Sequence, residues 1–155
     1  MLFRSDPAMT AAIAEARRTF SQAYQEIKKD RQRPKPAFEG VMVKAAFRDP
    51  KPDPKPDPKP EETKSTEAAV EHMWVTEITF DGKVIKGILA SPPDNLTSIK
   101  QDDEVTVELS DLSDWTYIAK GKIFGGFTEK LLHKRMSPEE KKEHNEATGL
   151  DWDVP

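Results

Sequence analysis

The stretch from Glu71 to Thr128 constrains the fold more than any other part of the chain, because it holds most of the strand-forming sequence. Two strand-like runs, at about 72–80 and 83–90, are separated only by Asp81-Gly82, which is typical of a two-residue β-hairpin turn. Gly87, inside the second run, indicates a bulge or a close approach by another backbone. Further strand-like runs occur at 40–47, 104–109, 115–119 and 122–124. These runs predict an antiparallel sheet.

An amphipathic helix is predicted before the sheet, from about Pro7 to Lys29, with Asp6 as its cap. Its apolar face comprises Met9, Ile13, Ala16, Phe20, Tyr24 and Ile27. After the sheet, Thr128 is expected to cap one short helix and Ser137 a second. The predicted fold is therefore α+β, with the N-terminal helix packed on a strongly bent antiparallel sheet of about five strands, followed by short C-terminal helices.

Residues 49–66 carry a Lys-Pro-Asp-Pro repeat. Alternate prolines exclude a helix and remove the donors that a sheet needs, so this segment is predicted to be a disordered proline-rich insertion. We expect a single domain over residues 1–155, with a frayed tail from about residue 147 in which Trp152 can fold back on the domain.

Residues 72–80 are expected to place Trp74, Thr76, Ile78 and Phe80 on one face.

Composition narrows the possible partners. The 155 residues carry a net charge of −4, which does not favour nucleic acid, although Lys130, Lys134 and Arg135 form a local basic run that we interpret as a solvated helix face. With no cysteine, no apolar run of membrane length and no ligand spacing among three histidines, we expect no metal, cofactor or membrane contact. The expected state is a cytoplasmic monomer or weak dimer with a protein or peptide partner.

Several residues follow the pattern of a known family. They are Glu71-His72-Met73-Trp74-Val75, Gly87, Pro92, Ser113-Asp114-Trp115, Tyr117, Gly121 and Gly125-Gly126-Phe127-Thr128. This ordered series resembles the bacterial YegJ-like family, a domain of unknown function numbered 2314 (DUF2314). The chain departs from the pattern at Gln101, where the pattern commonly has glycine, and in the proline-rich expansion. The resemblance implies a fold but no established activity.

A candidate binding surface follows from the aromatic and glycine residues that gather in the connections. It comprises His72, Trp74, Asp114, Trp115, Tyr117, Gly125, Gly126, Phe127 and Thr128. No catalytic set is recognisable, so a non-enzymatic binding module is the favoured function. One alternative is a small hydrolase or transferase using His72, Asp114 and Thr128, if these side chains converge. Another is an immunity or antitoxin-type inhibitor, whose acidic charge would suit a basic toxin.

Each candidate residue also has a structural interpretation. His72 can bond a neighbouring loop, Asp114 can accept from backbone amides of its own turn, and Trp115 can anchor the core. The segment Gly125–Thr128 can be a tight strand-to-helix turn, since it lacks the lysine pattern of a phosphate-binding loop.

Overall fold

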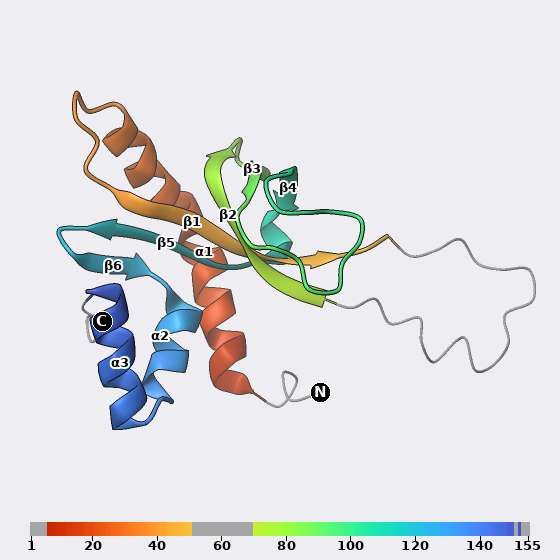
Figure 1. Ribbon diagram of the computed structural model, residues 1–155. Coiled ribbons are helices and arrows are strands. Elements are labelled where there is room, and N and C mark those ends of the chain that lie inside the picture. The colour runs from red at the N-terminus through yellow and green to blue at the C-terminus, as the bar shows by residue number, and fades with distance from the viewer. Residues whose placement is uncertain (1–5, 51–69, 151, 153–155) are drawn as a thin grey trace, which may run out of the picture.

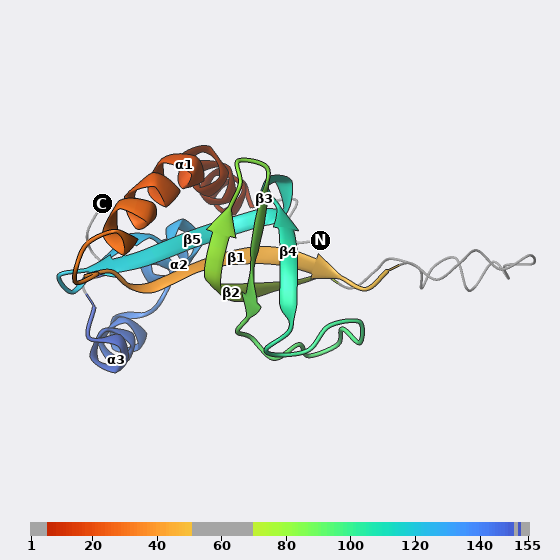
Figure 2. The same cartoon turned by 90° about the horizontal axis from the view of Figure 1, so that it is seen from above.

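The computed structural model describes residues 6–50, 70–150 and 152, and it confirms an α+β fold (Figure 1). The elements are α1 (Pro7–Arg31), β1 (Glu39–Arg48), β2 (Val70–Phe80), β3 (Val84–Leu89), β4 (Glu104–Glu108), the 3₁₀ turn η3 (Leu109–Asp111), β5 (Leu112–Ala119), β6 (Lys122–Gly125), α2 (Phe127–Lys134) and α3 (Pro138–Thr148). The six strands form one antiparallel sheet in the order β4-β3-β2-β1-β5-β6. Seen from above, β3 and β4 run steeply across the direction of β1 and β5, so the sheet is strongly twisted (Figure 2).

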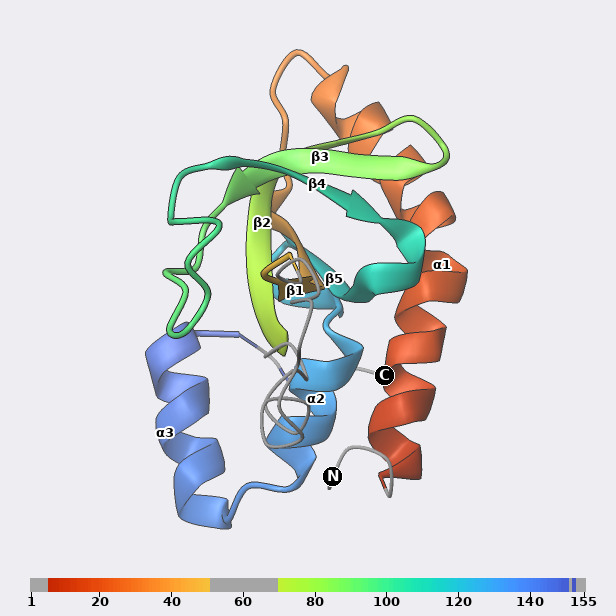
Figure 3. The ribbon, with the colours of Figure 1, turned by 90° about the vertical axis from the view of Figure 1, so that its right-hand side faces the viewer.

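Helix α1 begins as predicted, with the Asp6 carboxylate accepting from the Met9 N–H at 3.1 Å. Its buried residues begin at Ala16 and include Phe20 and Tyr24, whose rings meet Phe80 of β2. The half that precedes Ala16 has no buried residue. That half runs alongside α2 below the sheet (Figure 3). It therefore leaves apolar surface that the sheet does not cover.

The sequence prediction of one continuous face on β2 is wrong at Trp74 and Thr76. Glu77 has a φ of 52°, and the pairing with β3 shifts register between Thr76 and Thr79. This β-bulge moves the core side from Met73 and Val75 before it to Ile78 after it. Trp74 and Thr76 consequently face away from the core.

Gly87 of β3 explains why the bulge fits there. A Cβ at this position would lie 2.5 Å from the Thr76 carbonyl oxygen, so only glycine allows the approach of the bulged strand. The expectation of a close backbone approach at Gly87 is confirmed.

Carboxylates fix the β3–β4 loop. Glu71 accepts from the backbone N–H groups of Asp94, Asn95 and Leu96, and Asp49 accepts from those of Thr97 and Ser98. Asp49, the first residue of the predicted insertion, is thus held in place by hydrogen bonds to this loop. Positions 51–69 of the insertion lie outside the described residues.

The C-terminal helices begin in two different ways. Ser137 caps α3 as predicted, and together with Glu140 it forms a capping box. At α2, however, the N-cap is Gly126 with a φ of 62°, and Thr128 does not cap the helix as expected. Beyond α3, Trp152 folds back on the domain, where it is buried and stacks on His133.

Candidate functional site

The sheet divides the predicted binding surface into two parts. Successive residues of β5 point to opposite faces, so Trp115 faces α1 and donates its indole N–H to Thr19 at 3.0 Å. Asp114, its neighbour, points to the other face and contacts Thr128. The nine predicted residues therefore do not form one continuous surface.

Asp114 holds the start of α2. Its side chain is fully buried, and its two oxygens accept from the N–H groups of Trp115, Phe127 and Thr128 at 2.9, 2.9 and 3.0 Å, as well as from the Thr128 hydroxyl. Burial raises the pKa of Asp114, and the hydrogen bonds from Thr128 and Trp115 act in the opposite direction. A carboxylate with four donors has no free position for a substrate proton, so Asp114 acts as a remote helix cap.

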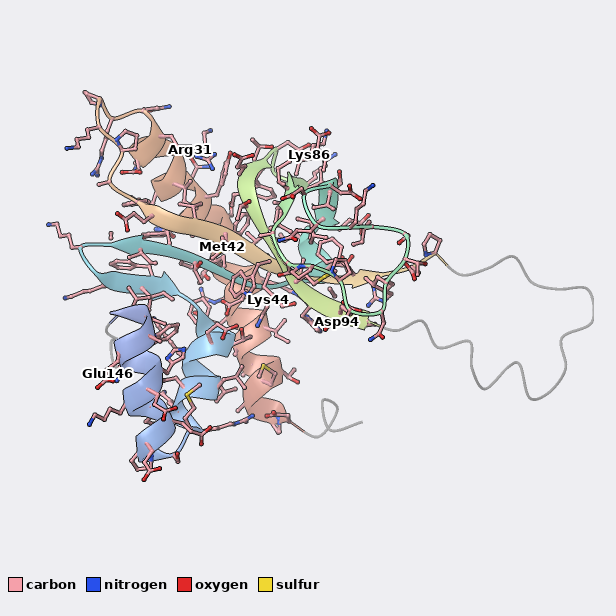
Figure 4. All side chains as sticks on the ribbon, in the orientation of Figure 1. Arg31, Met42, Lys44, Lys86, Asp94 and Glu146 are labelled. Carbon is pink, nitrogen blue, oxygen red and sulfur yellow. The ribbon has the colours of Figure 1, made fainter. Side chains whose placement is uncertain are left out.

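Lys44 completes this network, and sequence reasoning missed it. Its ammonium donates to the Thr128 hydroxyl at 2.7 Å and to Glu129 at 3.2 Å, and it lies 5.4 Å from the centre of the Trp74 ring. Lys44 and Met42, both labelled in Figure 4, are two residues apart on β1, so their side chains lie on the same face of the strand. The sequence placed Lys44 in the strand-like run 40–47, but it gave no signal for a contact with α2.

His72 has a different partner from the one expected for a catalytic set. Its Nδ1 lies 2.7 Å from the Ser113 hydroxyl, and no hydrogen bond joins His72 to Asp114 or Thr128 in the described part of the chain. Burial, followed by the charges of Lys44 and two arginines, lowers the pKa of His72, so its ring is neutral at pH 7. Ser113 is only 1% exposed. The pair resembles a nucleophile with its base, but the hydroxyl has no access to a substrate.

The residues on the α1 side form an aromatic cluster that reaches the surface. Tyr117 stacks between Phe38 and Phe124, with ring centres 4.3 and 5.0 Å away, and it also lies against Trp115. Phe127 meets Trp115 edge to face. Phe124 is 40% exposed, so the cluster ends in an aromatic ring open to solvent.

A groove of about 700 Å³ lies beside Phe124, between the N-terminal half of α1 and α2. It is lined by Ala8, Ala11, Ala12, Glu15, Phe124, Gly125, Phe127, Lys130, Leu131, Lys134 and Trp152. Gly125 and Phe127 are the members that the sequence prediction contained. The alanines, Phe124 and the lysines were missed, although the three- and four-residue spacing of the alanines is a signal for one helix face.

The basic run at the end of α2 is not uniformly solvated. Arg135 forms a two-pronged ion pair with Asp6, with both distances 2.8 Å. Lys130 and Lys134 instead line the groove. Burial lowers the pKa of Lys130, while Asp114 raises it and Lys134 lowers it.

Within 6–50, 70–150 and 152, no group of three or more His, Asp or Glu side chains could hold a metal ion. No helix in those ranges has the length and hydropathy needed to cross a membrane.

Two known bacterial proteins are similar in sequence to this chain. One is the Neisseria meningitidis protein named "Putative ankyrin repeat protein NMB1133/NMB1171", which is 33% identical over 152 residues, covering 98% of this chain and 55% of that protein. The other is "Uncharacterized protein YegJ" of Escherichia coli, 33% identical over 58 residues, or 37% of this chain and 38% of that protein. The chain thus spans about half or less of the length of these relatives. No solved structure matches.

The residues from Glu71 to Thr128 that resemble the family pattern fall within a match that covers nearly the whole chain. The model of the family described as "Uncharacterized protein conserved in bacteria (DUF2314)" matches residues 6–152, which include the helix, the whole sheet and the C-terminal helices. The chain belongs to this family.

Proposed function

We propose that this protein is a non-enzymatic binding module that holds a segment of another protein in the groove between α1 and α2. The observation that carries this proposal is the uncovered apolar surface of that groove. Ala8 and Ala11 are exposed on α1, and the 40% exposed ring of Phe124 lies at the same groove. A cluster of exposed apolar groups in a concave site is typical of a protein interface.

Two of the three residues of the enzyme alternative, Asp114 and Thr128, are buried. The Asp114 carboxylate is filled by four donors, and Thr128 is 1% exposed and already bonded to Asp114 and Lys44. His72 is paired with a buried serine. These contacts support structural roles for the three residues of the hydrolase hypothesis.

The Neisseria relative adds support from its name. Ankyrin repeats are stacked units of two helices and a turn, and such arrays present extended binding surfaces. The described residues of this chain form a sheet with helices instead. The match covers 55% of the Neisseria relative, so the remaining part of that protein has room for such repeats. An ankyrin-repeat region in the same protein as a domain similar to this chain is consistent with a role in protein interaction for this chain.

The test uses two matched substitutions on one helix. Ala11 lines the groove, and Ala14 is exposed on α1 but does not line it. Affinity capture from the source bacterium should recover a partner with the wild type and Ala14→Glu, and lose it with Ala11→Glu, while all three proteins keep the same melting temperature. Equal recovery by Ala11→Glu would show that the groove is not the binding surface.

A further inference from the structure

The groove carries positive charge, although the chain as a whole carries −4. Lys130 and Lys134 are four residues apart on α2, so they lie on the same side of the helix. Neither forms a salt bridge with another described residue. Among the described residues that line the groove, Glu15 is the only acid, and its carboxylate is paired with Arg18. Within the part of the chain that the structure describes, the site therefore presents two cations without a matching anion.

We infer that the occupant of the groove is an acidic amphipathic helix, whose apolar side enters between α1 and α2 and whose carboxylates meet Lys130 and Lys134. This inference rests on the proposed function, because it names the chemistry of the partner for the same surface. Helix-in-groove binding of this kind uses apolar anchors on one helix face and charges at the rim.

The dimensions of the groove suit a helix. Its walls are helical, and the lining residues Ala8 to Glu15 and Phe127 to Lys134 each extend over about 10 Å, or two turns, at 1.5 Å per residue. Alanine at the contact positions of α1 allows another backbone to come close. A partner with apolar residues at positions i, i+3, i+4 and i+7 would span the same two turns.

The concave shape argues against a lipid surface. A helix that lies on a membrane presents a convex apolar face, whereas here the apolar residues line a hollow together with Lys130 and Lys134. The hollow favours side chains that project into it from a partner. The partial burial of Lys130, which lowers its pKa, would then be offset by a partner carboxylate.

The test uses two synthetic helical peptides with the same leucine spacing, one flanked by glutamates and the other by lysines. Their affinities for the full chain are measured by fluorescence anisotropy, with anionic phosphatidylserine vesicles as a third probe. The acidic peptide should bind at least about tenfold more tightly than the basic one, since two ion pairs contribute to its affinity alone. Its affinity should fall as salt rises.

Matched variants assign the effect to the groove. The double substitution Lys130→Gln with Lys134→Gln should remove the preference for the acidic peptide. Lys86→Gln with Lys142→Gln changes the charge equally at two exposed lysines outside the groove and should leave the preference intact. Thermal melts of both double variants check that the fold is kept.

The outcomes separate the two proposals. If both peptides bind equally and Ala11→Glu abolishes both, the groove is a binding site but the acidic partner is wrong. If only the vesicles bind, and binding needs the two lysines, the site serves a lipid surface and the inference is overturned. If nothing binds the wild type, the inference fails as well, and the capture experiment alone decides the proposed function.

Discussion

The substitution Asp114→Asn tests whether the buried carboxylate is a helix cap. The two oxygens of Asp114 accept from three backbone N–H groups and one hydroxyl, on residues at the β6–α2 turn and on Trp115. An asparagine keeps the shape but has only one accepting oxygen. If that oxygen stays with Trp115 and Phe127, the new amide group faces the Thr128 N–H, and two donors then oppose each other.

The expected loss in the free energy of unfolding for Asp114→Asn follows from these hydrogen bonds. One buried N–H without a partner costs about 1–3 kcal/mol, and the remaining hydrogen bonds lose the strength that the charge gave them. A smaller effect acts in the opposite direction, because the neutral amide avoids the burial of a charge, which is what raises the pKa of Asp114. We expect a net loss of about 2–4 kcal/mol in the free energy of unfolding.

The measurement is urea denaturation followed by tryptophan fluorescence, together with hydrogen exchange of the Phe127 and Thr128 amides. Asp94→Asn is the matched control, because Asp94 is exposed, and it should change stability by less than about 0.5 kcal/mol. A loss for Asp114→Asn as small as that of the control, with unchanged exchange at both amides, would refute the cap.

Three other substitutions test separate parts of the structure. Gly125→Ala should lower the free energy of unfolding by more than about 3 kcal/mol in thermal melts, because the new Cβ would lie 2.2 Å from the Trp115 carbonyl oxygen at a φ of 73°. The control Gly82→Ala, with open space around it, should lower it by about 1–2 kcal/mol. Equal losses in the two variants would contradict the close approach at Gly125. Hydrogen bonds from Ser98 and Thr97 lower the pKa of Asp49 to about 2. The stabilisation from Asp49 is therefore full above its ordinary pKa of 3.8 and disappears as pH falls toward about 2. In Asp49→Asn, the free energy of unfolding should fall less steeply with pH over this range, and an unchanged slope would argue against these hydrogen bonds. His72→Ala should reduce stability by about 1–3 kcal/mol, since it leaves the buried Ser113 hydroxyl unpaired. A hydrolase activity that falls a hundredfold in this variant would instead favour the enzyme.

Signals that act over a few residues predicted the fold well. Asp81-Gly82 identified the hairpin, and Ser137 identified the start of α3, because in each case the chain satisfies its own backbone within four residues. The start of α2, by contrast, is not determined by residues close to it in the chain. Its donors are met by Asp114, 13 residues away from Phe127, and Gly126 supplies the turn, so the nearby Thr128 was a misleading local signal.

Register and surface depend on contacts between distant segments. The face of β2 changes at Glu77 because Gly87 of the neighbouring strand admits the bulge, and no feature of β2 alone marks that position. The groove likewise requires the N-terminal half of α1 to lie beside α2, more than a hundred residues later in the chain. Sequence periodicity found the helix but could not distinguish the half that packs on the sheet from the half that leaves apolar surface open.

The lysines of this protein show how structural and binding charges differ. Lys44 is mostly buried, yet its ammonium has partners in Thr128 and Glu129, so its charge is satisfied within the fold. Lys130 and Lys134 have no such described partner beside an apolar hollow. With a net charge of −4, the whole molecule repels an acidic peptide at distance. Screening limits this repulsion to about 8 Å at physiological ionic strength, whereas the lysines act at contact. An acidic partner would thus gain little in association rate, and its preference for the groove should appear mainly as slow dissociation.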